Sequence, residues 1–252
     1  MRVVVLGSGT SAGVPTLGCD CDVCRSINPR NKRLRSSVYI EEAGLRMLVD
    51  CGPDFRTQAI NHSIRDVDCV LLTHTHADHI NGIDDLRAYN MMRNHPIDVY
   101  ALPEALDELR RRFDYCFRPP PLGSMVPDLI LHKLRDNDDI RGVGVQTIPI
   151  IHGEMEIIGF RFEKFAYLTD VSRIPELSYA MLEGLEVLML NALRRRPHPL
   201  HMNLEQAVTS ARRIGARRTW FTHICHDLDH DQINAQLPAE MQLAHDGLVF
   251  EI

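Results

Sequence analysis

The sequence contains little lysine, a single tryptophan and no long apolar run. Lysine occurs at only three of 252 positions, so the 28 basic side chains are nearly all arginine, and 34 acidic side chains outnumber them. A chain with a net charge of −6 has no overall attraction for a nucleic-acid backbone. No apolar stretch approaches the roughly 18 residues that a membrane span requires. Residues 1–6 are too short for the hydrophobic region of a signal peptide. We therefore expect a cytoplasmic protein without a membrane partner.

The cysteines do not have the spacing of a disulfide framework. Cys19, Cys21 and Cys24 lie within six residues, whereas the other four of the seven are scattered. This distribution indicates metal binding in a reducing compartment. Three thiolates need one further ligand to complete a tetrahedral structural zinc site, and His226 is our candidate for it. The alternative is a set of three reduced thiols that bind nothing.

The length and patterning favour one α/β domain over residues 1–252. Helices are predicted over Pro103–Phe113 and over Asn203–Ile214, with Asn203 as N-cap. Asp246-Gly247 predicts a two-residue hairpin, and the Pro119–Pro121 run is not interpreted as a domain linker. Short β-branched runs predict strands at Val3–Leu6, Val38–Glu41, Met47–Asp50, Cys69–Thr73, Val99–Ala101, Val143–Ile150, Ile157–Glu163, Tyr167–Thr169, Val187–Leu190, Thr219–Thr222 and Leu248–Ile252.

Four of these predicted strands lead into a potential metal ligand. The ligands are His74, His152, Asp170 and His223. Open α/β sheets place their sites beyond the carboxyl ends of strands, so we expect the four side chains to converge. A polar strand terminus that enters a turn explains any one of them, but not readily all four.

The densest local signal is the segment Thr73–His79, which reads Thr-His-Thr-His-Ala-Asp-His. Three imidazoles and one carboxylate on a tight turn suit borderline cations such as zinc, manganese or iron. One metal could hardly use all four groups, so the string indicates two ions side by side. The alternative is a solvated histidine-rich loop.

This string resembles the signature of the metallo-β-lactamase fold superfamily, and the resemblance continues along most of the chain. It implies a four-layer αββα fold with mixed sheets. It also implies that Asp50, in Asp50-Cys51-Gly52, holds the metal-ligating side chains in position without binding a metal itself. The implied ligands are His74, His76 and His152 for the first metal, Asp78, His79 and His223 for the second, and Asp170 as a bridge between them.

Two further segments are similar to the PhnP family of phosphonate-pathway phosphodiesterases. They are the glycine-rich start, residues 7–15, with the cysteine knuckle 19–24 behind it, and the closing segment Thr222–His226. The glycine-rich part lacks the Gly-Lys-Ser/Thr ending of a phosphate-binding P-loop. The resemblance implies one structural zinc, a catalytic pair of manganese or zinc ions, and His201 as catalytic acid beside the ligand Asp78. His198 is the next candidate for the acid, and Arg56 is a candidate phosphate contact.

We therefore expect a metal-dependent hydrolase, and in first place a phosphodiesterase. Its substrate would be a small or cyclic phosphodiester similar to a phosphoribosyl cyclic phosphate, attacked by a hydroxide shared between two metals. A tRNA 3′-processing nuclease of the same fold is a rival, although three lysines and no long basic insertion argue against it. Two more hypotheses are a cofactor-biosynthesis protein similar to PqqB, which shares the knuckle, and a structural zinc-binding module. A homodimer is left open.

Overall fold

Two mixed β-sheets form the centre of the molecule. The computed structural model describes residues 1–119 and 122–252, and within them each sheet has seven strands. The first sheet has the order β14-β1-β2-β3-β4-β5-β6, and the second has the order β13-β12-β11-β10-β9-β8-β7. The first comprises β1 (Arg2–Gly7), β2 (Ser37–Glu42), β3 (Leu45–Val49), β4 (Cys69–Leu71), β5 (Ile97–Ala101), β6 (Leu129–Lys133) and β14 (Val249–Glu251). The second comprises β7 (Asn137–Ile140), β8 (Val143–His152), β9 (Met155–Phe162), β10 (Phe165–Leu168), β11 (Val187–Asn191), β12 (Arg218–Thr222) and β13 (Met241–Leu243).

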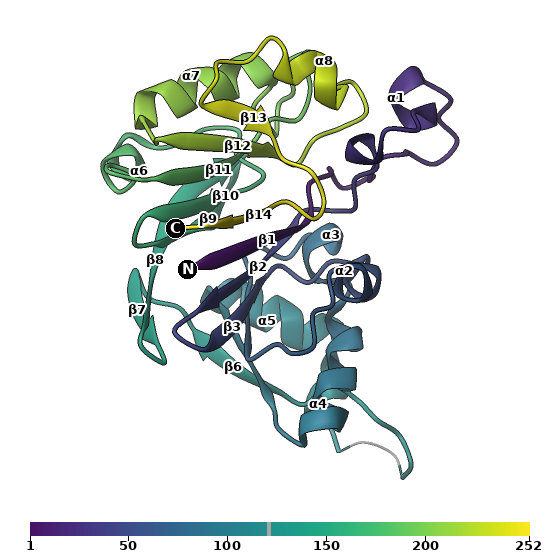
Figure 1. The fold of residues 1–252 in the computed structure, drawn as a ribbon. Helices are drawn as coiled ribbons and strands as arrows, with labels where there is room; N and C mark the ends of the chain where they lie inside the picture. Colours follow the sequence, from purple (N-terminus) through teal and green to yellow (C-terminus); the bar gives the residue numbers. More distant parts are fainter. Residues whose placement is uncertain (120–121) are drawn as a thin grey trace.

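Helices cover the outer face of each sheet, so the layers follow the order α, β, β, α (Figure 1). The first sheet is covered by α2 (Phe55–Asn61), α3 (Ala77–Ile80), α4 (Arg87–Arg93) and α5 (Pro103–Arg112). The second is covered by α6 (Glu176–Ala180), α7 (Leu204–Ile214) and α8 (His230–Asn234). The short helix α1 (Asp22–Arg25) lies on an arm that projects from the body, and 3-10 turns span Pro29–Asn31, Ile83–Leu86 and Asp114–Phe117. This arrangement confirms the expected αββα fold.

Apolar side chains fill three layers of core, one between the sheets and one under each set of helices. In β10 every residue is buried, because the strand packs between the other sheet on one face and helices on the other. Phe165 and Tyr167 point between the sheets, whereas Ala166 and Leu168 point toward the helices. Strands covered on both faces therefore read as continuous apolar runs, as expected for such layers.

The two predicted helices and all eleven predicted strands are present, with ends shifted by up to a few residues. Asn203 caps α7 through a hydrogen bond from the Gln206 amide, with the reciprocal bond also formed. The hairpin predicted at Asp246-Gly247 is wrong, because β13 belongs to the second sheet and β14 to the first. The Asp246 carboxylate instead accepts hydrogen bonds from Ser8 and Leu34, which hold the turn against the first sheet.

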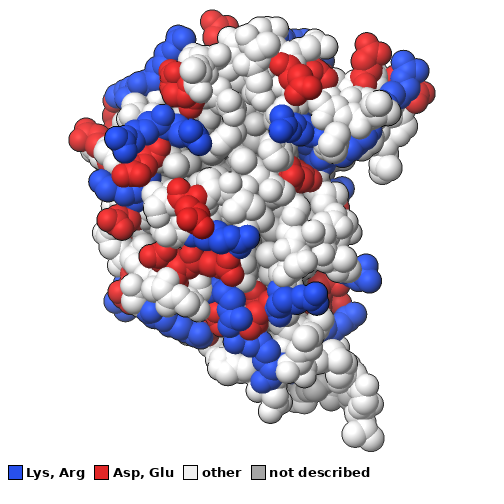
Figure 2. Space-filling model, viewed as in Figure 1, with Lys and Arg blue, Asp and Glu red and all other residues white. Residues whose placement is uncertain are grey.

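Two features of the outside of the molecule complete the description. Basic and acidic side chains are interspersed over the face in Figure 2, without a large field of one sign. Among the described residues, no helix is long and apolar enough to cross a membrane. Most of the Pro119–Pro121 run lies outside the described residues.

Candidate metal centre

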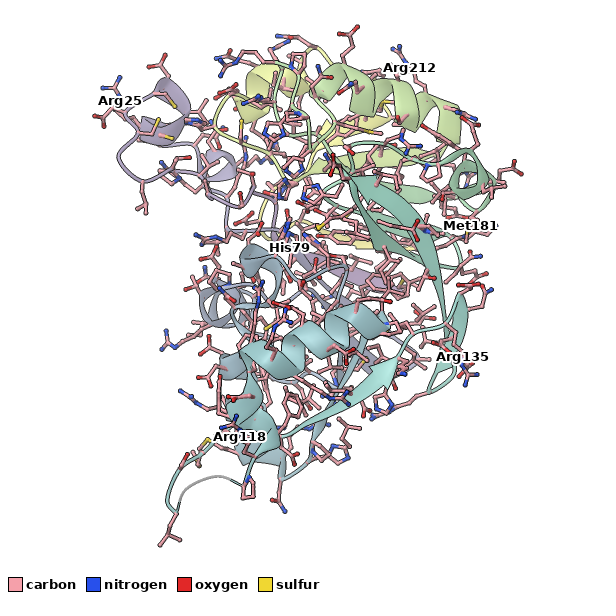
Figure 3. All side chains as sticks on the ribbon, turned by 180° about the vertical axis from the view of Figure 1, so that it is seen from behind. Arg25, His79, Arg118, Arg135, Met181 and Arg212 are labelled. Carbon is pink, nitrogen blue, oxygen red and sulfur yellow. The ribbon has the colours of Figure 1, made fainter. Side chains whose placement is uncertain are left out.

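Strand ends from both sheets bring seven histidine and aspartate side chains together. β8, β10 and β12 run in the same direction within the second sheet, so their carboxyl ends lie along one edge. His152 ends β8, whereas Asp170 and His223 lie just beyond β10 and β12. The Thr73–His79 turn follows β4 of the first sheet. Figure 3 shows His79 between the two halves of the molecule, on the side of the arm that carries Arg25. The convergence expected from the strand ends is therefore present.

The side chains form two adjoining clusters that match the two predicted ligand sets. In the first cluster, one ligand atom from each of His74, His76 and His152 lies within 4.8 Å of the others. The second cluster meets the same limit and consists of Asp78, His79, Asp170 and His223.

Asp170 lies between the clusters and uses both carboxylate oxygens. Its Oδ2 is 3.2 Å from Nε2 of His79, and its Oδ1 is 3.3 Å from Nε2 of His223. Asp170 also groups with His152 of the first cluster and with His201. This position between two donor sets suits a carboxylate shared by two cations.

The electrostatics of the clusters favour bound cations. Burial alone would raise the pKa of Asp170, but the imidazoles of His223 and His79 hold it well below its ordinary value. Burial and the neighbouring His79 lower the pKa of His74 well below the usual value, so its ring is neutral. The carboxylates of Asp170 and Asp50 have the opposite effect on His79 and raise its pKa against the effect of burial. Carboxylates beside imidazoles form a hard and borderline donor set that suits zinc or manganese.

Hydrogen bonds at Nδ1 fix which nitrogen of three imidazoles faces the cluster. Nδ1 of His79 donates to Asp50 at 2.7 Å, and Nδ1 of His152 donates to the Leu200 carbonyl at 2.8 Å. The Thr73 hydroxyl donates to Asp50 at 2.8 Å and therefore accepts from Nδ1 of His74 at 2.9 Å. All three rings therefore carry a proton at Nδ1, and in the neutral ring the Nε2 lone pair would be free for a metal. Nε2 of His74 is buried without a hydrogen-bond partner among the described residues, as a vacant ligand atom would be, whereas Nε2 of His79 lies 3.2 Å from carboxylate oxygens of both Asp78 and Asp170.

The backbone around these residues is held in costly conformations. Asp50, Asp170 and His223 have positive φ angles of 61°, 61° and 54°. Left-handed conformations are uncommon for residues other than glycine, and they cluster at functional sites where the surrounding structure enforces them. Gly52 meets a different constraint, because a Cβ atom there would lie 2.0 Å from the Asp78 carbonyl oxygen. The Asp50-Cys51-Gly52 element thus supports the ligand turn by direct backbone contact.

The three knuckle cysteines, on the projecting arm, form a separate group with His226, which lies just beyond β12. Nδ1 of His226 lies 3.1 Å from Sγ of Cys19, 3.5 Å from Sγ of Cys21 and 3.4 Å from Sγ of Cys24. A tetrahedral zinc with Zn–S of about 2.3 Å and Zn–N of about 2.0 Å places sulfur and nitrogen roughly 3.5 Å apart. The structure therefore brings together the four residues predicted for the structural zinc.

Known proteins are similar to this chain in both fold and sequence. Residues 45–224 match the β-lactamase superfamily domain. The crystal structure of a diphosphatase from the PhnP family superposes with a TM-score of 0.93 at 44% identity, covering 100% of this chain and 97% of that one. The chain belongs to the PhnP family of the β-lactamase superfamily.

Of two other similar proteins, one is about twice as long as this chain and the other has a less similar sequence. An octanoyltransferase of Porphyromonas gingivalis is 39% identical over 253 residues, but this chain spans only 51% of that protein's length. The zinc-bound PqqB of Methylobacterium extorquens shares the fold at a TM-score of 0.79 and 22% identity, covering 100% of each chain. The metallo-β-lactamase fold and the donor sets together imply divalent metals in this PhnP-family protein.

Among the other predicted site residues of this PhnP-family protein, His201 lies against the clusters and Arg56 does not. The His201 ring stacks on His223 with centroids 4.8 Å apart, and its Nδ1 lies 3.7 Å from Asp170. Burial and the neighbouring His223 lower the pKa of His201 to about 3. His198 stands behind it at 5.1 Å between ring centroids. Arg56 lines a different pocket, between α2 and α4, that contains none of the predicted metal ligands.

Sequence reasoning missed two groups that orient the ligands. The Thr73 hydroxyl links His74 to Asp50, and its position directly before the histidine string was the available signal. The Leu200 carbonyl orients His152, but a backbone oxygen carries no signature in the sequence.

Proposed function

We propose that this protein is a metal-dependent hydrolase that cleaves a phosphodiester bond in a small molecule. The observation that carries the proposal is the pair of adjoining donor clusters with Asp170 between them. Sites with two metals serve enzymes that displace a group at phosphorus, because both the attacking and the leaving oxygen need stabilisation. The similarity to a PhnP-family diphosphatase supports the same kind of reaction.

The residues present fit two divalent cations at the clusters and one zinc at the knuckle. His74, His76 and His152 would hold the first cation, Asp78, His79 and His223 the second, and Asp170 would be shared. Such cations supply Lewis acidity to the phosphoryl group and make water a nucleophile near neutral pH. We infer manganese or zinc for this pair, and zinc for the Cys19, Cys21, Cys24 and His226 group.

The chain's own groups position the reaction. Asp50, Thr73 and the Leu200 carbonyl hold three imidazoles in one tautomer and one orientation, so the donor atoms are arranged before substrate binds. His201 lies beside both clusters without belonging to either predicted ligand set, which makes it the candidate donor of a proton to the leaving oxygen. Burial lowers the pKa of His201 to about 3, so the free ring is neutral near pH 7. The ring would therefore have to take up a proton from substrate or water before it could donate one to the leaving oxygen.

A P–O–P bond is the second candidate target, because of the diphosphatase relative. The leaving group distinguishes the two. A sugar or alkyl oxygen requires a proton as it departs, whereas a phosphate oxygen departs as a stable anion. Cleavage of diphosphate diesters therefore depends less on His201.

The test is a hydrolysis panel with protein reconstituted with manganese or zinc. The panel contains a cyclic ribose phosphate, a linear alkyl diester, a diphosphate diester, an octanoyl thioester and a β-lactam. We expect kcat/KM to be highest for one of the phosphorus esters or the anhydride. A preference for the thioester or the lactam contradicts the proposal. The octanoyl thioester also tests whether the activity named for the longer relative belongs to the part that this chain matches.

A further inference from the structure

A cleft of about 550 Å³ adjoins the first cluster and is not used by the reaction described above. His74 and His76 of the ligand turn line it, together with residues of helix α5 and the start of β9. His74 is 5% exposed, and its Nε2 is buried without a hydrogen-bond partner among the described residues. Because two predicted ligands of the first metal line it, the cleft adjoins the proposed reaction centre and can hold the rest of a substrate whose phosphorus lies there.

Three carboxylates line this cleft, and they come from two different elements. Glu104 and Glu108 are one turn apart on α5 and share a face, whereas Glu156 comes from β9. Among the described residues that line the cleft, none is lysine or arginine. Glu108 is already paired with Arg111 and Arg112 of its own helix. The exposed Glu104 and Glu156 thus supply the negative charge that a ligand would meet.

The remaining wall is apolar and is contributed by Leu102, Ala105, Met155 and Ile157. Met155 is 43% exposed, so it presents surface that a bound group would cover. An apolar wall with carboxylates at its rim suits a group that has carbon faces and outward hydrogen-bond donors. Sugar rings and alkylated amines have this character, but phosphate does not.

We propose that this cleft, here called the carboxylate cleft, binds the part of the substrate that carries hydroxyl or ammonium donors, and that Glu104 and Glu156 exclude a second phosphate from it. The inference rests on the proposed function, because it assumes that the reacting phosphorus lies at the metal clusters. A second phosphate, as in a phosphoribosyl substrate, has to lie on another side of the centre, such as that of His198.

Equilibrium binding tests the assignment without turnover. Phosphocholine and phosphoglycolate have the same phosphate but end in a cation and in a carboxylate, and calorimetry gives Kd for each with the metal-loaded protein. We expect phosphocholine to bind more tightly. Each of the variants Glu104→Gln and Glu156→Gln should reduce the ratio of the phosphoglycolate Kd to the phosphocholine Kd roughly two- to fivefold, the range expected for partly solvated charge pairs. Asp107→Asn is the matched control, since Asp107 lies on the same helix but its side chain is 79% exposed and outside the cleft lining.

A parallel hydrolysis assay separates this inference from the proposed function. p-Nitrophenyl phosphorylcholine and p-nitrophenyl phenyl phosphate share a leaving group and differ in the group that the carboxylate cleft would hold. If the wild type hydrolyses both esters, the double variant with Glu104→Gln and Glu156→Gln should have a higher KM than the wild type for the choline ester and an unchanged KM for the phenyl ester. If that variant has unchanged KM values and an unchanged ratio of the two Kd values, the role assigned to the carboxylate cleft is refuted, whereas the proposed function is unaffected. Failure to hydrolyse any phosphorus ester refutes the proposed function itself, and the calorimetric ratio still decides the cleft.

Discussion

Replacing Asp50 by asparagine tests whether the groups behind the ligands tune the metal centre. The Asp50 carboxylate is fully buried and accepts hydrogen bonds from the Thr73 amide, the Thr73 hydroxyl and Nδ1 of His79. Asparagine has nearly the same shape, and it tolerates the left-handed φ of 61° at this position better than most residues. Its amide nitrogen, however, donates and cannot accept, so one donor of Thr73 or His79 loses its acceptor.

The size of the effect follows from that lost bond. Hydrogen bonds to charged groups contribute about 1.5–3 kcal/mol, and loss of a partner behind a metal ligand typically weakens binding by about 10- to 100-fold. A 10- to 100-fold change corresponds to about 1.4–2.7 kcal/mol, so the two magnitudes agree. We therefore expect Asp50→Asn to bind manganese at the clusters about 10- to 100-fold more weakly than the wild type, with the knuckle zinc retained.

The assay is competition for manganese against a chelator of known affinity, with circular dichroism to confirm folding. Asp98→Asn is the matched control, because Asp98 is also a buried carboxylate that accepts a hydrogen bond from a histidine, His132 at 2.8 Å, but it lies on β5 outside the clusters. This control should lose stability and keep its manganese affinity. Wild-type affinity in a folded Asp50→Asn protein, or an equal loss in both variants, refutes the reasoning.

Three further changes test other parts of the account. His201→Ala should lower the rate about 10²- to 10⁴-fold on diesters with alkyl leaving groups and much less on nitrophenyl esters; loss of a bound metal in elemental analysis would instead identify His201 as a ligand. Cys21→Ser should remove one zinc per chain and lower Tm, because structural zinc contributes folding free energy directly; unchanged zinc content and Tm would show that the thiols bind nothing. Gly52→Ala should lower the free energy of unfolding measured in urea titrations by at least about 1–3 kcal/mol, since the alanine Cβ would lie 2.0 Å from the Asp78 carbonyl oxygen. Wild-type stability in this variant would contradict the required close contact.

The features predicted best from the sequence were those in which local chemistry and periodicity agree. The Thr73–His79 string concentrates ligands on one turn, and the strands that lead into His152, Asp170 and His223 have their carboxyl ends at one edge of the second sheet. The Asn203 cap was also readable, because its partner Gln206 lies within the same turn. In each case the residues that determine the structure are close in sequence or share a periodic pattern.

The features that were missed depend on distant contacts. Strand β7, Asn137–Ile140, is mostly polar and forms only by pairing with β8. The Asp246-Gly247 turn has the local composition of a hairpin, but the strands on its two sides pair with different sheets. The carboxylate cleft unites α5 with β9, which are about 50 residues apart along the chain. Contacts of this kind are set by the packing of the two sheets, which no short segment encodes.

The most direct test of the central claim is a manganese titration of metal-depleted protein that retains its knuckle zinc, with bound metal and phosphodiester hydrolysis measured in the same samples. The account predicts that hydrolysis rises with cluster occupancy and is complete at two equivalents of manganese per chain. It also predicts that His76→Ala, which removes a ligand of the first cluster, abolishes the rise while the knuckle zinc remains. Full hydrolysis in the depleted protein, or two bound equivalents without hydrolysis of any phosphorus ester, would contradict it.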